Sequence, residues 1–531
     1  MSKDTEIDMK DVELNEVDPE KQPMTEIDMK DVELNEVDPE KQPMTGDGQA
    51  AAAEKNGSVK LKVPEDEVTF TGLSKEELMK VAGTPGWVRT RWVLLVLFWL
   101  GWVGMLAGAI AIIVQAPRCK PIPEMNWWNE GPLYQISDVK AFSEGLGGVE
   151  GKLDDISQLK VKGLVLGPLH TVQPDKPVTM DLQKIDPAQG TLEQLTAVLK
   201  KANNKGISVV LDLTPNYLGA DPWFSSAHID DALQQVKAAA DYWLKLGVNG
   251  IKLSHFNLAS NSSYWSQLQD DVQGNRTEDT KKSLLMGTVE HKTASEVSQL
   301  LNTSGVDLIL SDLLNNNSGA NRIVDMDNLH SQQRSVGWGL GATQQDQLSK
   351  RAGTPALIRL YQLLLFTMPG TPVFTYGDEI GLQAQPGEKH PEMVWDIEKE
   401  PSEGAAHNET SEAKRKDYAD VRKWFKSLSD LRGKERALLH GDYYPLYSSA
   451  SSLSFLRVWD QSERYITAVN WGAQKETLRL KLEPKEGVEL PKTATVKLST
   501  DPKLEADSTV SLDQIELEPG HGVLLQFPYT G

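Results

Sequence analysis

The order of hydrophobic and charged positions divides the chain into parts of different character. Charged residues make up 25% of the sequence, yet none occurs in the 23 positions of segment 92–114. An apolar run of this length spans the ~30 Å hydrocarbon core of a bilayer when it forms a helix. The pattern therefore predicts one transmembrane helix over residues 92–114. A cleavable signal peptide is not expected, because the run starts far into the chain and is too long.

Small residues recur at helical spacing along this predicted helix. They are Gly101, Gly104, Ala107, Gly108 and Ala111. Such residues let a second membrane helix approach closely, so we predict that they form a packing face. Trp87 and Trp92 suit one membrane interface, while Trp127 and Trp128 suit either the other interface or the domain that follows.

From Leu133 onward, short apolar runs alternate with amphipathic stretches. The apolar runs are 163–167, 209–213, 250–253 and 308–311. Thr191 and Gln194 have the capping-box spacing of a helix start, and 230–246 has a helical apolar face. Regular β/α alternation predicts an α/β protein whose residues 125–440 form a (β/α)8 TIM barrel, with no domain inserted after the third strand.

After residue 440 the helical period gives way to short alternating strands. They are predicted at 454–459, 465–470, 477–482, 495–498 and 522–527. We therefore expect a small antiparallel β domain over 441–531. An extracellular neck over 115–124 would connect the transmembrane helix to the barrel.

The N-terminal part is acidic and repetitive. Residues 5–24 recur without change as 25–44, and the first 45 residues carry about half of the net charge of −21. Such a segment cannot bury enough apolar surface to fold alone, so we predict a disordered tail over 1–70. The juxtamembrane segment 71–91 should contain a short helix over 73–80. The acidic balance argues against a nucleic-acid partner.

Flanking charges and glycosylation sequons predict the orientation. The basic residues near the run are Lys75, Lys80, Arg89 and Arg91 before it, and Arg118 and Lys120 after it. This bias places the N-terminus in the cytosol, as in a single-pass type II protein. Apart from Asn56, the sequons follow the run, at Asn261, Asn275, Asn302, Asn316 and Asn408. These five are candidate N-glycosylation sites of an extracellular C-terminal part.

Cys119 is the only cysteine of the chain and lies five residues beyond the predicted helix. The extracellular space is oxidising, and an unpaired cysteine there indicates either an intermolecular disulfide or a free thiol. Nine scattered histidines and one cysteine show no metal-ligand spacing, so neither a metal nor another cofactor is expected.

Several segments resemble the α-amylase superfamily of retaining glycosidases. The most specific is 368–382, followed by 212–217, in which Tyr217 replaces the usual His. The resemblance implies a nucleophile and a general acid/base, two carboxylates ~5 Å apart. Ser254 and Thr288 occupy these two positions, Lys252 replaces the usual Arg, and the Asn-His-Asp motif is not visible at 336–342. The resemblance therefore implies a barrel without its catalytic pair.

Other residues at the predicted strand ends offer little replacement chemistry. Ser254 would need a base to attack, and His255 should point to the opposite face of the strand. Glu290 could share the direction of Thr288 and act as an acid. Asp212 and Asp312 are expected to be structural hydrogen-bond acceptors. We predict no enzymatic activity, because losing carboxylates that act as a unit costs orders of magnitude in rate.

A membrane-anchored barrel of this kind resembles the heavy chains of the heteromeric amino-acid transporters. The matching segments are 70–78, 86–92, 98–102, 116–119, 159–167, 211–217 and 369–382. The missing inserted domain favours the 4F2 type. The resemblance implies a plasma-membrane glycoprotein that is disulfide-linked through Cys119 to a light-chain amino-acid transporter, together with association with β-integrins.

Two alternatives from other classes remain open at this point. One is an adhesion or signalling receptor that uses its acidic tail and ectodomain as contact surfaces. The other is an anchored α-glucosidase that uses Glu290 or another carboxylate.

Overall fold

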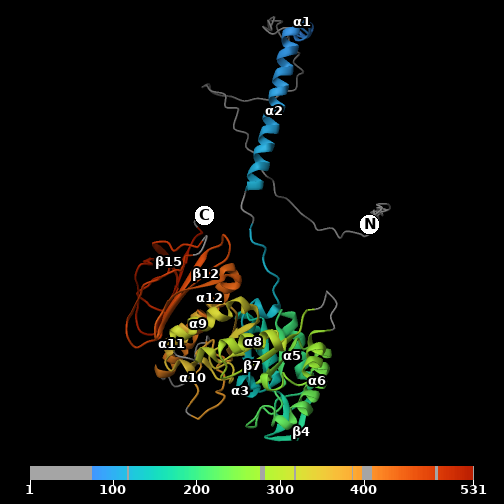
Figure 1. Ribbon diagram of the computed structural model, residues 1–531, viewed down its shortest axis with the longest axis vertical. Coiled ribbons are helices and arrows are strands. Elements are labelled where there is room, and N and C mark those ends of the chain that lie inside the picture. The colour runs from blue at the N-terminus through green and yellow to red at the C-terminus, as the bar shows by residue number, and fades with distance from the viewer. Residues whose placement is uncertain are drawn as a thin grey trace, which may run out of the picture. The chain divides into compact units, whose positions relative to one another are not determined.

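The computed structural model describes residues 74–115, 119–274, 281–315, 318–385, 387–397, 409–484 and 488–529. The predicted acidic tail with its duplication and the sequons at Asn56, Asn275, Asn316 and Asn408 lie outside these ranges. The chain divides into two compact units, residues 1–114 and residues 115–531 (Figure 1). Each unit is described by itself.

In residues 74–114, the described part of the N-terminal unit, the chain forms two helices, the second of which extends to Gln115. Helix α1 (Lys75–Ala82) starts at a capping box, in which Ser74 Oγ accepts the Glu77 N–H and Glu77 accepts the Ser74 N–H. The helix therefore lies two residues further along than the predicted 73–80. Helix α2 (Pro85–Gln115) is 31 residues long and has a mean hydropathy of 2.3 over its most apolar stretch. It is long and apolar enough to cross a membrane, and it contains the predicted span 92–114.

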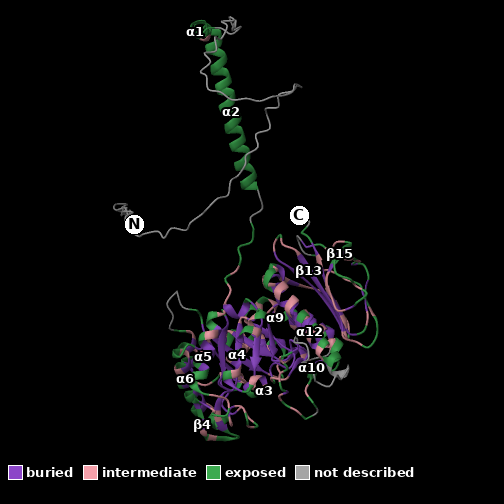
Figure 2. Ribbon diagram, turned by 180° about the vertical axis from the view of Figure 1, so that it is seen from behind, coloured by how far each residue is buried: buried purple, intermediate pink, exposed green. Residues whose placement is uncertain are grey.

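No side chain of α2 is buried within the structure, as Figure 2 shows. A Cβ atom added at Gly101, Gly104 or Gly108 would meet nothing within 4 Å. The small face is thus open to a helix from another chain. Whether Gly101, Gly104, Ala107, Gly108 and Ala111 pack against such a helix stays a prediction.

The second unit begins with a closed barrel of eight parallel strands in the order β1-β10-β9-β8-β7-β6-β5-β2. The strands are β1 (Leu133–Ile136), β2 (Gly163–Leu166), β5 (Ser208–Asp212), β6 (Gly250–Ser254), β7 (Leu284–Val289), β8 (Leu308–Ser311), β9 (Val336–Trp338) and β10 (Thr371–Thr375). This confirms the predicted TIM barrel. The carboxyl ends of the strands therefore meet at one mouth.

Helices cover the outside of the barrel, and Figure 2 shows their inner faces and the strands as buried. They include α4 (Leu146–Gln158), α5 (Leu192–Asn204), α6 (Ile229–Lys245), α7 (Trp265–Gln273), α8 (Ala294–Ser304), α9 (Gly319–Leu329), α11 (Pro355–Thr367) and α12 (Glu409–Lys434). Helix α5 starts at the predicted capping box of Thr191 and Gln194. Helix α6 buries Leu233, Val236 and Trp243, as its sequence pattern indicates.

Two features of the barrel differ from the sequence interpretation. A hairpin of β3 (His170–Gln173) and β4 (Lys176–Ile185) follows the second strand and was not predicted. Trp127 and Trp128 are 6% and 1% exposed and pack against interior residues such as Leu133. Of the two places considered for these tryptophans, the membrane interface is therefore wrong, and they belong to the barrel core.

The chain ends in an antiparallel sheet of order β11-β12-β13-β18-β15-β16, beside the pair β14-β17. The strands are β11 (Asp442–Ser448), β12 (Ser452–Val458), β13 (Arg464–Asn470), β14 (Glu476–Leu478), β15 (Thr493–Ser499), β16 (Thr509–Ser511), β17 (Ile515–Leu517) and β18 (His521–Phe527). The predicted β domain is thus present. Sequence reasoning missed β11, β16 and β17, two of which have only three residues.

Two buried arginines stabilise this region: Arg457 links the sheet to the barrel, and Arg432 links helix α12 to the end of α11. Arg457 of β12 donates to the carbonyls of Thr367 and Gly441, at 2.9 and 3.0 Å. Arg432 of α12 donates to the carbonyls of Phe366 and Met368, at 2.5 and 3.1 Å, and to that of Gly370. Most of these acceptors lie at the C-terminal end of α11, where carbonyls lack helical partners and the helix dipole favours a cation.

Candidate functional site

A cavity of about 660 Å³ opens at the mouth of the barrel. It is lined by residues that end or follow the barrel strands, including Ser137, Asp138, Pro168, Asp212, Ser254, His255, Glu290 and Gln345. This is the position at which TIM-barrel enzymes place their active sites.

Ser254 and Thr288, the positions of the expected carboxylates, are direct neighbours on β6 and β7. Ser254 is partly exposed and lines the cavity. Thr288 is 1% exposed, and its hydroxyl has no hydrogen-bond partner among the described residues. The two side chains supply hydroxyl groups and no carboxylate, so they cannot perform the two-carboxylate chemistry of a retaining glycosidase.

Asp212, the last residue of β5, forms an ion pair with Lys252 in the middle of β6. Their Oδ2 and Nζ atoms are 3.0 Å apart, and both side chains are 0% exposed. Asp212 also accepts hydrogen bonds from the N–H and hydroxyl of Thr214, at 3.0 and 2.5 Å, and from Gln345 at 3.0 Å. Its carboxylate is thus fully engaged in structure, as the sequence predicts for this residue.

The remaining carboxylates of the cavity are also engaged, apart from Glu290. Asp138 accepts the backbone N–H groups of the first turn of α3 (Val139–Ser143), and Asp186 accepts the Ala188 N–H at 2.9 Å. Asp312, outside the cavity lining, accepts the His291 N–H at 3.0 Å. Glu290 therefore has no free carboxylate beside it in the described lining with which to form a catalytic pair.

His255 lies on the cavity side, and the expectation that it points away from this side is wrong. Strand β6 ends at Ser254, and His255 adopts a left-handed conformation with φ of 50°, so strand alternation does not apply to it. Its Nε2 atom is 3.8 Å from Glu290 Oε2. That separation exceeds a hydrogen bond, and the two groups attract only when the histidine is protonated.

The segment that most resembles amylases has a structural role in this chain. Gly377 has φ of 89°, a conformation that favours glycine, and it turns the chain after β10. Asp378 accepts the N–H groups of Leu348 and Thr375, while Glu379 accepts Tyr134 Oη at 2.8 Å. Burial raises the pKa of both carboxyl groups. These acids hold the end of β10 in place.

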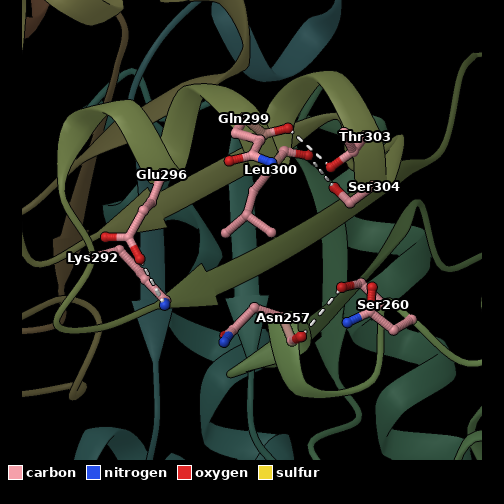
Figure 3. A pocket seen from close by; sticks show the side chains of 9 residues that line it. Asn257, Ser260, Lys292, Glu296, Gln299, Leu300, Thr303 and Ser304 are labelled. Carbon is pink, nitrogen blue, oxygen red and sulfur yellow. Dashed lines mark hydrogen bonds and ion pairs between the residues drawn. The ribbon is translucent and has the colours of Figure 1, made fainter.

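A second hollow, of about 300 Å³, lies between the segment after β6 and helix α8. Figure 3 shows Asn257 and Ser260 on one side and Gln299, Leu300 and Thr303 on the other. Lys292 and Glu296 pair across its end at 3.0 Å. The exposed sequon residue Asn261 lines this hollow as well, and Asn302 is exposed on α8. Both asparagines are thus accessible to modification.

In the described ranges, no group of three or more His, Cys, Asp or Glu side chains could hold a metal ion. Cys119, the predicted disulfide position, is exposed at the start of the second unit.

His170 gives the cavity region a pH dependence. This histidine is 2% exposed, and burial lowers its pKa from the ordinary 6.5 to about 4. Below pH 6.5 the unfolded chain binds a proton that the folded chain excludes, so stability should fall between pH 6.5 and 4. The difference corresponds to about 3 kcal/mol.

Urea titrations of the wild type and of His170→Gln at pH 7 and pH 4.5 test this expectation. Glutamine can still donate to the Pro215 carbonyl, which lies 3.4 Å from His170 Nε2. The variant should lose less stability between the two pH values than the wild type. A His291→Gln control changes a side chain that is 87% exposed and should leave the wild-type slope intact. Equal slopes for all three proteins would contradict the prediction.

Comparisons with known proteins agree with this geometry. Two family models match the chain: the solute carrier family 3 member 2 N-terminus over residues 58–134, and the alpha-amylase catalytic domain over residues 137–271. An alpha-amylase structure from Geobacillus thermoleovorans has a TM-score of 0.57 at 18% identity, covering 77% of this chain and 100% of that chain. At this identity the likeness shows the fold alone.

Curated relatives cover the whole chain. The amino acid transporter heavy chains SLC3A2 of Oryctolagus cuniculus and Mus musculus are each 44% identical to it, over 100% of both chains. The heavy chain SLC3A1 of Homo sapiens is 22% identical, over 86% of this chain and 85% of its own. Full-length identity of this degree, on a barrel whose family carboxylates are absent, leads to one conclusion: the chain belongs to the SLC3A2 family of amino acid transporter heavy chains.

Proposed function

We propose that this chain is a non-catalytic heavy subunit that forms a disulfide through Cys119 with a polytopic light chain and brings that light chain to the plasma membrane. The light chain would then exchange amino acids. The observation that carries the proposal is an exposed, sole cysteine four residues beyond the apolar helix α2, in a full-length relative of transporter heavy chains.

The described helices support assigning the amino-acid pathway to the partner subunit. Only α2 is long and apolar enough, within the described residues, to cross a membrane. A single helix cannot enclose a path for a polar solute, whereas several helices can. The amino-acid pathway therefore belongs to the partner, and the open glycine face of α2 is available to pack against it.

The barrel supports a non-catalytic role. Ser254 and Thr288 supply no carboxylate, and the Asp212 carboxylate is neutralised by Lys252 at 3.0 Å. With these groups, the mouth of the barrel offers a cavity and hydrogen-bonding side chains but no catalytic acid/base pair. The ectodomain would thus act through its surface.

Type II topology completes the proposal. The basic residues before the apolar run favour a cytosolic N-terminus, and the exposed Asn261 and Asn302 would then carry glycans outside the cell. The sequons at Asn275, Asn316 and Asn408 belong to the same proposed set.

A non-reducing gel of membranes tests the proposal, with wild type beside Cys119→Ser. The wild type should run as a larger, reducible species that contains a multi-span transporter by mass spectrometry, and the variant should run as a monomer. Peptide N-glycosidase should increase the mobility of the reduced heavy chain. Labelling with an impermeant biotin reagent should recover less of the transporter from the surface of cells that lack the heavy chain. A monomer in both lanes would contradict the disulfide.

A further inference from the structure

The neck that follows Cys119 is stiff and is fixed at its far end. Pro121 and Pro123 fix their own φ angles and restrict Lys120 and Ile122 to extended conformations. At the far end of the neck, Trp127 is buried in the barrel core. The location of Cys119 therefore depends on what the near end of the neck contacts.

Lys120, the residue directly after Cys119, contacts three residues of the C-terminal β domain. Its backbone N–H donates to Asp460 Oδ2 at 3.0 Å, and its Nζ lies 3.4 Å from Asp442 Oδ2. The same Nζ lies 4.6 Å from the ring centre of Trp459, a cation–π distance. These partners are more than 300 residues away in sequence.

The register of the terminal sheet builds this contact site. Strands β11 and β12 are antiparallel, and Asp442 pairs with Val458. The first residue of β11 therefore lies beside the end of β12, which continues into Trp459 and Asp460. Trp459 is 5% exposed, and its ring centre lies 5.4 Å from the centre of the His440 ring. Asp442 and Trp459 thus contact the Lys120 ammonium group, while Asp460 accepts the Lys120 backbone N–H.

We infer that Lys120 is a positioning residue that holds the neck on the β domain and so presents Cys119 at a defined place for its disulfide. The inference rests on the proposed disulfide with a light chain. Without the contact, the neck would be anchored only from Trp127 onward, and Cys119 would sample a larger volume. The effective concentration of its thiol at the partner cysteine would then fall.

The first test needs no partner protein. Because Cys119 is the only cysteine, a nitroxide spin label can be attached there in the full chain in detergent. Lys120→Ala and Asp460→Ala should each raise the mobility of the label in its electron paramagnetic resonance spectrum. Lys120→Arg keeps the charge and the ring contact and should resemble the wild type. Lys184→Ala, on an exposed lysine of β4, is the matched control. Identical mobility in all five proteins would overturn the inference.

The second test measures how fast the disulfide with the light chain forms in pulse-labelled cells. Lys120→Ala should slow it by roughly two- to fivefold, the range set by one exposed ion pair, and Lys120→Arg should restore the rate. The thermal unfolding of the variants should match the wild type. An unchanged rate, despite a mobile label, would refute the positioning role. If the wild type itself forms no disulfide, the proposed function fails as well, while the spin-label result stands separately.

Discussion

Replacing Lys252 by methionine is expected to lower the free energy of unfolding by about 3–5 kcal/mol, because the Asp212 carboxylate would stay buried without its cation. Both side chains are 0% exposed, so water cannot replace the lost partner. Methionine has a similar length and is apolar, so the loss reports charge rather than volume. Urea unfolding of the full chain in detergent, followed by tryptophan fluorescence, measures the change.

The double variant Asp212→Asn with Lys252→Met tests whether the unpaired buried charge causes the loss of stability. Removing both charges should cost less than removing one, since no uncompensated ion remains in the barrel. Lys184→Met, on an exposed lysine, is the control and should leave stability unchanged. If Lys252→Met unfolds like the wild type, the hydrogen bonds from Thr214 and Gln345 suffice to stabilise the carboxylate.

Arg457→Met is expected to destabilise the junction between the barrel and the β domain by about 3 kcal/mol. The substitution leaves the carbonyls of Thr367 and Gly441 buried without their charged donor. Burial, followed by repulsion from Arg432, lowers the pKa of Arg457, and relief of this repulsion offsets only part of the loss. In hydrogen-exchange measurements, amides of β12 and of the C-terminal end of α11 should exchange faster in the variant than in the wild type. Amides of α5 should be less affected.

The matched control for this prediction is Arg479→Met, which changes an exposed arginine in the same domain. It should leave both stability and exchange unchanged. Uniform protection in Arg457→Met would mean that apolar packing alone holds the sheet to the barrel. Since β12 leads into Trp459 and Asp460, which contact Lys120, a loosened junction should also increase the mobility of a spin label on Cys119.

Local patterns in the sequence were enough to predict most elements. The capping boxes at Ser74 and Thr191 satisfy backbone groups within one turn, so their effect can be read from neighbours. The apolar face of α6 is likewise a local periodicity. The short β16 and β17 escaped because three residues cannot display a period.

The candidate site was predictable only in part. Motif order placed Ser254 on one barrel strand and Thr288 on the next along the chain, and these strands, β6 and β7, are neighbours in the barrel. The position of His255 was missed, because a left-handed residue directly after β6 breaks the alternation on which the prediction rested. A lysine inside the apolar strand 250–254 does indicate a buried counter-charge, but the sequence does not name it.

Periodicity, length and motifs along the chain were enough to predict the long apolar helix, the barrel, the terminal sheet and the heavy-chain family. Tertiary structure alone decided which charges meet. Lys252 pairs with Asp212, the Arg457 guanidinium donates to the carbonyl at the end of α11, and the Lys120 ammonium group reaches Asp442 across 322 residues. The physical reason is that buried polar groups must find partners wherever folding brings strand and helix ends together, independent of their separation in sequence.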